Sequence, residues 1–222
     1  MEQAAARVVD WERIDTVLVD MDGTLLDLAF DNFFWQELVP QSYASKHGLA
    51  LDVARDRLTP RFDAVAGTLS WYCLDHWTRD LDLDLEALKR KHRHLIRFLP
   101  GATEFLAAVR QRGKHLQIVT NAHRRTLAVK AEQTGVDKLV DGVVCSHDFR
   151  TPKETAAFWH ALEQRDRFNP ERTLLVEDSV PVLSAARAYG LKHTIAIRRP
   201  DSQLPRRIIA DFTAVDGVAD LV

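Results

Sequence analysis

The sequence predicts an α/β protein: a Rossmann-like, doubly wound parallel sheet with an inserted α-helical cap. Beyond Pro100, short apolar strands alternate with amphipathic helices, which is the pattern of βαβ units. An apolar strand also lies near the start of the chain, at residues 16–19. The intervening segment, residues 29–98, has helical spacing and no convincing strand. We therefore expect a core of residues 1–28 and 99–222 and a cap of residues 29–98 over one edge of the sheet.

The cap segment contains three helical patterns. Asp31 can cap a first helix, which we expect to end at Leu38, before Pro40. Apolar residues recur at helical spacing over residues 51–62 and again over residues 81–88. These patterns predict a cap made of packed helices.

The core segment alternates strands with helices. The predicted strands are residues 115–120, 142–145, 173–176 and 193–197, and the predicted helices are residues 103–112, 124–134, 152–165 and 180–189. Thr103 is expected to cap the first of these helices. Thr151, Pro152 and Glu154 have the spacing of a capping box before the third. The last residues suggest a short strand and a terminal helical turn.

Composition excludes several classes of protein. The 222 residues carry a net charge of −2, without the basic excess of nucleic-acid or membrane-surface proteins. No apolar run approaches the roughly 18 residues of a membrane span, and residues 1–15 lack the apolar centre of a secretory signal. Cys73 and Cys145 match no disulfide or zinc spacing, so we expect free thiols. These features predict a soluble, cytoplasmic monomer or weak dimer without nucleic-acid or membrane partners.

One basic run, KRKHRH at residues 89–94, interrupts this balance. We interpret the run as the solvated face of a helix, and attraction of a phosphate group is the alternative.

Polar side chains follow the strands of the predicted sheet where each strand ends. They are Asp20 and Asp22 after the first strand, Thr120 and Asn121 at the second, Lys153 beyond the third, and Glu177 and Asp178 after the fourth. Because the carboxyl ends of parallel strands share one edge, these side chains should meet in one crevice. A simple turn would explain one of these segments, but it would not explain their convergence.

Such a crevice suits phosphoryl transfer. Clustered carboxylates raise one another's pKa values unless a cation lies among them, and all-oxygen ligands favour a hard ion such as Mg²⁺. One aspartate can then act as a nucleophile while a protonated neighbour acts as general acid. Lys153 would balance phosphate charge, and Thr120 would donate a hydrogen bond to a phosphoryl oxygen.

Four motifs, in order, resemble those of the haloacid dehalogenase superfamily. They are DMDGT at residues 20–24, the strand ending in Thr120, Lys153, and VEDS at residues 176–179. The resemblance implies an enzyme, a phosphoric monoester hydrolase with this core and a helical cap. A non-catalytic binding protein on the same fold would normally have lost one of these acids.

The same resemblance implies a role for each site residue. Asp20 would be the nucleophile that becomes aspartyl-phosphate, and Asp22 would protonate the leaving group and then activate water. Thr120, Asn121 and Lys153 would bind the phosphoryl group. The Mg²⁺ ligands would be Asp20, the backbone carbonyl of Asp22 and Asp178, with Glu177 a direct or water-mediated neighbour.

Segments around the motifs are similar to bacterial GMP/IMP nucleotidases of this superfamily. They are DLAFDNFFW at residues 27–35, SWYCLDHW at residues 70–77 and VTNAH at residues 119–123. This similarity implies a purine 5′-mononucleotide as substrate. The alternative is a phosphatase or phosphomutase for another small phosphorylated metabolite, such as a sugar phosphate or phosphoglycolate.

Several cap residues are candidates for contact with a base. The aromatic candidates are Phe33, Phe34, Trp35, Trp71, Tyr72 and Trp77. One or two of them could stack on a purine ring, and the rest would pack the cap helices together. Asn32 could contact a base edge, and His123 could border the phosphate or face solvent. Asp27 is expected to stabilise the loop after the first strand.

Overall fold

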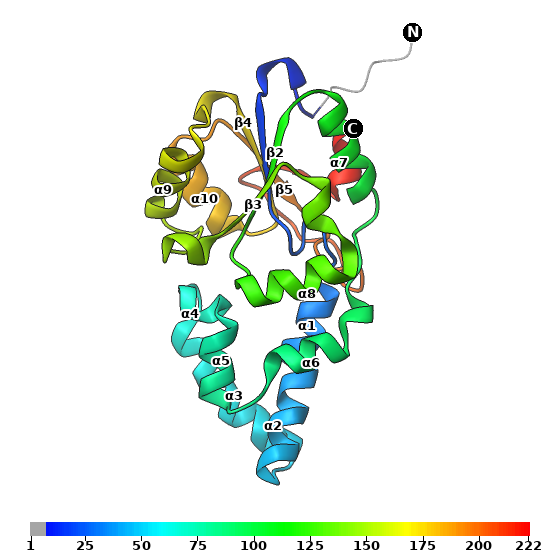
Figure 1. Cartoon of the computed structure of the whole chain (residues 1–222), viewed down its shortest axis with the longest axis vertical. Helices are drawn as coiled ribbons and strands as arrows, with labels where there is room; N and C mark the ends of the chain where they lie inside the picture. The colour runs from blue at the N-terminus through cyan, green and yellow to red at the C-terminus, as the bar shows by residue number, and fades with distance from the viewer. Residues whose placement is uncertain (1–7) are drawn as a thin grey trace.

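Within residues 8–222, which the structure describes, six parallel strands form one sheet in the order β3-β2-β1-β4-β5-β6. This computed structural model is shown in Figure 1. The strands are β1 (Thr16–Val19), β2 (His115–Thr120), β3 (Gly142–Cys145), β4 (Thr173–Glu177), β5 (His193–Ile197) and β6 (Thr213–Val215). The strand order reverses between β1 and β4, which is where doubly wound sheets bind ligands. The predicted fold class is confirmed.

Helices cover both faces of the sheet, because the central strands are apolar on both sides. β1 and β4 are buried at every position. The flanking helices are α7 (Ala102–Gln111) and α8 (Arg124–Thr134) on one face, and α9 (Ala156–Asp166) and α10 (Val180–Tyr189) on the other. The chain ends in the short strand β6 and a 3₁₀ turn, Val218–Leu221, as the sequence predicted.

The chain from α1 to α6, between β1 and α7, is helical and forms a separate lobe beside the sheet, drawn from blue through cyan to blue-green in Figure 1. Its helices are α1 (Ala29–Phe33), α2 (Val39–His47), α3 (Leu51–Val65), α4 (Leu69–Tyr72), α5 (Leu74–Leu81) and α6 (Leu85–Lys91). An isolated bridge pairs Leu26 with Phe98, where the chain leaves and re-enters the core. The predicted helical insertion is therefore present, and we call it the cap.

The sequence predicted that the first cap helix ends at Leu38, before Pro40, and this prediction is wrong. α1 continues through a π-helical turn, Phe34–Leu38, directly into α2. The wider turn places Pro40 in the first turn of α2, where the missing proline N–H is not needed. The apolar pattern over residues 81–88 also belongs to two helices, because Asp82 adopts a left-handed conformation (φ 50°) between them.

Two predicted helix caps are wrong. α7 starts after Gly101 (φ 75°) instead of Thr103, and a Cβ atom on Gly101 would lie 2.5 Å from the Ala219 side chain. The helix expected at Pro152 begins four residues later, with Thr155 at its N-cap. Its capping box does not form, because Glu154 makes tertiary contacts instead.

None of the helices in the described residues is long and apolar enough to cross a membrane. The segment that argues against a secretory signal includes residues 1–7, which lie outside the described residues.

Candidate active site

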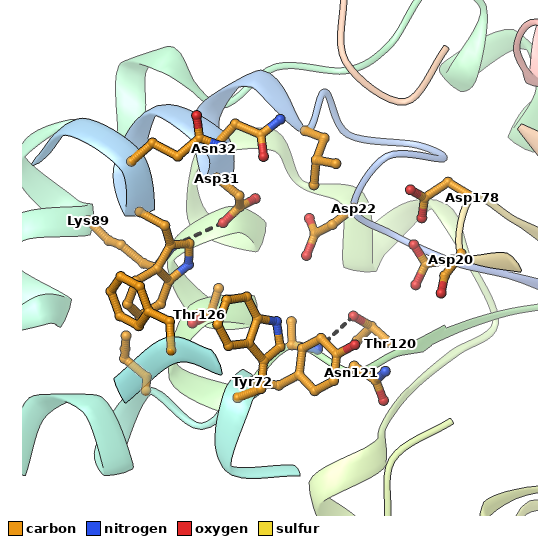
Figure 2. A pocket seen from close by; sticks show the side chains of 18 of the residues that line it. Asp20, Asp22, Asp31, Asn32, Tyr72, Lys89, Thr120, Asn121, Thr126 and Asp178 are labelled. Carbon is orange, nitrogen blue, oxygen red and sulfur yellow. Dashed lines mark hydrogen bonds and ion pairs between the residues drawn. The ribbon is translucent and has the colours of Figure 1, made fainter. Parts of the chain in front are cut away.

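The carboxyl edge of the sheet and the cap enclose a cavity of about 750 Å³. Every predicted site residue lines it: Asp20, Asp22, Thr120, Asn121, Lys153, Glu177 and Asp178. Figure 2 shows the side chains of Asp20 and Asp178 next to each other, with Asp22 and Asp31 further along the cavity. The structure thus brings together residues at or just beyond the carboxyl ends of β1, β2 and β4 with Lys153 from the loop after β3.

Lys153 is the buried cation of this crevice. Its Nζ donates to Asp20 Oδ1 at 2.5 Å, to Glu177 Oε2 at 2.7 Å and to the Val119 carbonyl at 3.0 Å. Burial disfavours the ammonium, but the Asp20 and Glu177 carboxylates outweigh burial and raise the pKa of Lys153. The loop that carries Lys153 is fixed by the Asn121 side chain, which accepts its backbone N–H at 3.0 Å.

Three buried carboxylates, those of Asp20, Glu177 and Asp178, offer oxygen atoms within 4.8 Å of one another. Burial raises the pKa of Asp20 to about 8, and the Glu177 charge adds to this shift. Burial also raises the pKa of Glu177 to about 7 and that of Asp178 to about 6. Full ionisation of the three carboxyl groups is therefore costly, and an added cation would relieve that cost.

The cluster fits a hard divalent cation. All of its ligand atoms are carboxylate oxygens, as such ions prefer. The loop passes close to Asp178 because Gly23 (φ 86°) has no side chain; a Cβ atom there would lie 2.8 Å from the Asp178 carboxylate. The Asp22 carboxylate lies outside this cluster, so Asp22 enters the predicted ligand set only through its backbone carbonyl.

These raised pKa values predict how stability and metal binding change with pH. In the folded protein these three carboxyl groups keep protons that they have released in the unfolded chain, so their contribution to the free energy of unfolding falls as pH rises from about 4 towards 8. Because Mg²⁺ competes with those protons, we expect Mg²⁺ to raise Tm more at pH 8 than at pH 6. Thermal unfolding with and without Mg²⁺ at both pH values checks this. An equal or larger rise at pH 6 would contradict it.

A second charged network, which the sequence did not predict, surrounds Asp22. Its Oδ1 accepts a hydrogen bond from Lys130 Nζ at 2.6 Å, and the same Nζ donates to Asp31 Oδ2 at 2.5 Å. Lys89 Nζ donates to the other oxygen of Asp31 at 3.0 Å. Lys130 lies on the buried face of α8 with Thr126 and Leu127. A lysine at a position that helical spacing assigns to the buried face could have indicated a buried ion pair.

The interpretation of the basic run as a solvated face is wrong at Lys89. The residue is only 1% exposed, and its Nζ lies 3.9 Å from the centre of the Phe34 ring. The α6 helix turns this side chain inwards because Asp31 and the aromatic ring supply partners for the charge. Its ammonium group pairs with Asp31, so Lys89 gives no support to the alternative that the basic run attracts a phosphate group.

The two carboxylates of this network are shifted in opposite directions. Burial raises the pKa of Asp22 despite its contact with Lys130. At Asp31, Lys130 and Lys89 together outweigh burial and lower the pKa to about 2. Asp31 is thus a permanent anion, whereas Asp22 is able to carry a proton.

A chain of hydrogen bonds connects the crevice with the cap. The Asn121 amide donates to Glu154 Oε2 at 2.9 Å, and the Tyr72 hydroxyl donates to Glu154 Oε1 at 2.5 Å. Thr120 Oγ1 accepts the Ala122 N–H at 3.0 Å, which leaves its own hydroxyl hydrogen available to a ligand. Figure 2 shows Tyr72 beside Asn121 at this side of the cavity.

The aromatic candidates divide into two groups. Trp35, Trp71 and Tyr72 line the cavity, together with Phe62, which the sequence analysis did not single out. Phe34 and Trp77 are buried in the hydrophobic core, and Phe33 is exposed outside the cavity. The packing interpretation is therefore right for Phe34 and Trp77.

The remaining candidates also have defined places. Asn32 lines the cavity and donates to Asp201 Oδ2 at 2.7 Å. Asp27 stabilises its loop, as predicted, by accepting from Ser202 and from the Ala29 N–H. His123 is half-buried at the start of α8 and does not line the cavity.

Comparisons with known proteins identify the family of this chain. The sequence model of the haloacid dehalogenase-like hydrolases matches residues 14–190. The GMP/IMP nucleotidase YrfG of Escherichia coli is 40% identical over 199 residues, which is 90% of each chain. The N-acetylmuramic acid 6-phosphate phosphatase of Pseudomonas aeruginosa is 30% identical over 192 residues, 84% of this chain and 82% of that protein.

A solved structure shows the same fold. The HAD phosphatase of Thermococcus onnurineus superposes with a TM-score of 0.78 at 23% identity, covering 94% of this chain and 96% of that chain. The family match spans residues 14–190, the range that contains every motif residue of the crevice. The chain therefore belongs to the haloacid dehalogenase-like hydrolases.

Proposed function

We propose that this phosphoric monoester hydrolase removes the phosphate group of purine 5′-mononucleotides, GMP and IMP, with Mg²⁺ as cofactor. One observation carries the proposal: a single cavity joins the carboxylate crevice to four aromatic side chains of the cap. We call these side chains the aromatic wall; they are Trp35, Phe62, Trp71 and Tyr72. Its volume of about 750 Å³ suits a ligand the size of a nucleotide. The Escherichia coli relative named as a GMP/IMP nucleotidase supports the choice of substrate.

Asp20 is the proposed nucleophile. Its carboxylate attacks the phosphorus atom, the ester bond to the 5′-oxygen breaks, and an aspartyl-phosphate forms. Lys153 and Thr120 would hold the phosphoryl oxygens, and both side chains lie at the same end of the cavity as Asp20. Mg²⁺ bound by Asp20, Asp178 and the backbone carbonyl of Asp22, with Glu177 nearby, would neutralise charge on the transferred group.

Asp22 is the proposed proton carrier. It gives a proton to the departing 5′-oxygen of the nucleoside and later takes one from a water molecule. That water attacks phosphorus, inorganic phosphate leaves, and the Asp20 carboxylate is restored. Lys130 donates to both Asp22 and Asp31, so it acts as a positioning residue for Asp22.

The aromatic wall is the proposed base site, with Trp71 as the ring that stacks on the purine. Stacking on one aromatic side chain contributes about 1–3 kcal/mol per base, or about 5- to 150-fold. We therefore expect Trp71→Leu to raise KM for GMP by that factor with little change in kcat, and to leave p-nitrophenyl phosphate hydrolysis unchanged. Phe33→Leu, which alters an aromatic ring outside the cavity, is the matched control. Equal effects on both substrates would show that Trp71 only supports the fold.

A panel of phosphate esters tests the proposed function. The purified protein with Mg²⁺ is assayed with GMP, IMP, AMP, CMP, glucose 6-phosphate, phosphoglycolate and N-acetylmuramic acid 6-phosphate. We expect the highest kcat/KM with GMP and IMP. A higher value with a sugar phosphate would support the alternative metabolite phosphatase, and an isomerised product would identify a phosphomutase. Cytoplasmic location, a monomer or weak dimer, and the lack of nucleic-acid partners stay predictions.

A further inference from the structure

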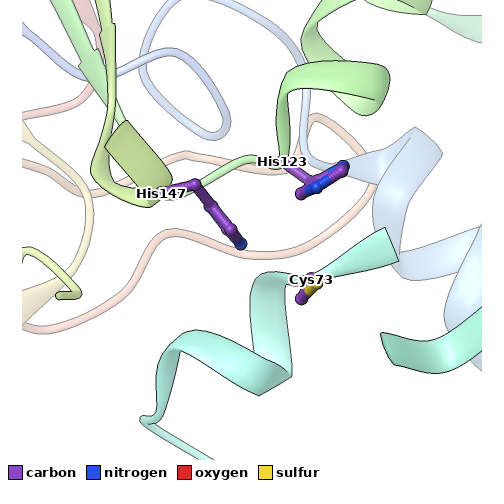
Figure 3. Close-up of side chains that lie close together, drawn as sticks. All are labelled: Cys73, His123 and His147. Carbon is purple, nitrogen blue, oxygen red and sulfur yellow. The ribbon is translucent and has the colours of Figure 1, made fainter. Parts of the chain in front are cut away.

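A second group of potential metal ligands lies outside the carboxylate crevice. Cys73, His123 and His147 each offer one ligand atom, and these atoms lie within 4.8 Å of one another. Figure 3 shows the three side chains converging from separate segments. Cys73 lies between α4 and α5 of the cap, His123 is the N-cap residue of α8, and His147 lies in a 3₁₀ turn after β3.

His147 is the least satisfied member of this group. Both of its ring nitrogens are inaccessible to solvent, and neither has a hydrogen-bond partner within residues 8–222. Buried polar atoms without partners are rare and costly, so such a ring indicates a missing ligand.

The potential ligand atoms of Cys73 and His123 make only long contacts. Cys73 Sγ accepts the His76 N–H at 3.4 Å, at the start of α5. His123 Nδ1 accepts the Arg125 N–H at 3.4 Å, and its Nε2 lies 3.7 Å from the Asp75 carboxylate. The ring centres of His123 and His147 are 4.9 Å apart. Small side-chain rotations would bring one sulfur and two nitrogens around a single ion.

We propose that Cys73, His123 and His147 bind a divalent transition-metal ion of the Zn²⁺ type, with Asp75 next to the fourth position. One sulfur and two imidazole nitrogens select a softer ion than Mg²⁺, which takes oxygen ligands. The protein therefore has two chemically different cation sites, and the carboxylate cluster at Asp20 does not share a ligand with this one.

The bound ion connects the cap to the core. Cys73 belongs to the cap, whereas both histidines belong to the core. Trp71 and Tyr72, which line the cavity, immediately precede Cys73 in the chain. An ion at this site fixes the aromatic wall against the sheet edge, so it should raise the Tm of the whole protein.

Cobalt titration of the full chain tests the proposal without relying on activity. The protein is stripped with a chelator and supplied with excess Mg²⁺ to fill the carboxylate cluster, and Co²⁺ is then added. We expect one equivalent to produce the visible bands of a tetrahedral site and a near-ultraviolet thiolate-to-cobalt band. Zn²⁺ should abolish both and raise Tm. A wild-type spectrum without the thiolate band would overturn the proposal.

Two variants locate the ion. Cys73→Ser should lose the thiolate band, and His147→Gln should weaken Zn²⁺ binding by at least ~100-fold, since loss of even an outer-shell partner costs about 10- to 100-fold. Cys145→Ser removes the other cysteine of the chain and should keep the full spectrum. Circular dichroism of the metal-free proteins confirms that each variant folds. Unchanged spectra and affinity in both ligand variants would place the ion elsewhere and contradict the assignment.

Discussion

Asp20→Asn is expected to lower kcat for GMP by on the order of 10⁴- to 10⁶-fold, since deleting the nucleophile in covalent catalysis has costs of this size. Asparagine has nearly the same shape but cannot attack phosphorus as a carboxylate does. The fold should remain intact, because Lys153 keeps its ion pair with Glu177, and burial and Glu177 already disfavour the charge on Asp20. The metal-free variant should therefore unfold at the same Tm as the wild type or at a higher one. Phosphate release and thermal unfolding measure the two effects.

Asp137→Asn is the matched control for this substitution. Asp137 is an exposed aspartate outside the cavity, so the same chemical change there should leave kcat unchanged. If Asp20→Asn keeps turnover comparable to that of Asp137→Asn, a different group is the nucleophile. An inactive Asp20→Asn protein with a Tm below that of the wild type would contradict the prediction that the fold remains intact.

Lys130→Met should lower the free energy of unfolding by about 3–5 kcal/mol, the usual cost of removing one partner of a buried ion pair. Lys130 is almost fully buried and pairs with both Asp22 and Asp31, so its loss leaves two carboxylates with only Lys89 nearby. Because Lys130 is the one hydrogen-bond donor to the Asp22 carboxylate within residues 8–222, we also expect kcat to fall by up to ~10²- to 10⁴-fold, the contribution of general acid–base catalysis. Denaturant unfolding and steady-state kinetics measure these changes.

A control variant and a compensating second substitution distinguish the loss of this ion-pair network from the general effect of replacing a lysine by methionine. Lys138→Met alters an exposed lysine in the 3₁₀ turn that follows α8 and should change neither quantity. Asp31→Asn added to Lys130→Met removes one of the two negative charges that then face Lys89 alone, and it should restore part of the stability but not kcat. The account of this network is contradicted if Lys130→Met destabilises no more than Lys138→Met.

The strands and most helices could be predicted because their apolar spacing is local. The crevice could also be predicted, since each of its residues follows a strand and parallel strands align their carboxyl ends. Asp20, Lys153 and Asp178 therefore meet where the sequence placed them.

The errors have tertiary causes. A π-helical turn moves Pro40 into the first turn of α2, and Tyr72 together with Asn121 takes Glu154 away from its expected cap. Lys89 is buried because Asp31, 58 positions earlier in the chain, folds onto it. No local pattern encodes these contacts.

The cysteine–histidine cluster was also beyond sequence reasoning. Cys73, His123 and His147 lie in three separate segments, without the short spacing of a zinc motif. Only the closure of the cap onto the sheet edge brings the sulfur to the two imidazole rings. By contrast, the burial of Lys130 could have been predicted from the sequence, because its position on the buried face of α8 follows from helical spacing.

A rapid-quench experiment tests the central proposal most directly. The enzyme is mixed with Mg²⁺ and GMP labelled in its phosphate group, quenched in acid during a single turnover, and digested for peptide mapping. The account predicts a transient label on the peptide that contains Asp20, and on that residue alone. An active wild-type enzyme that transfers phosphate to water with no labelled peptide, or with the label on another residue, would contradict it.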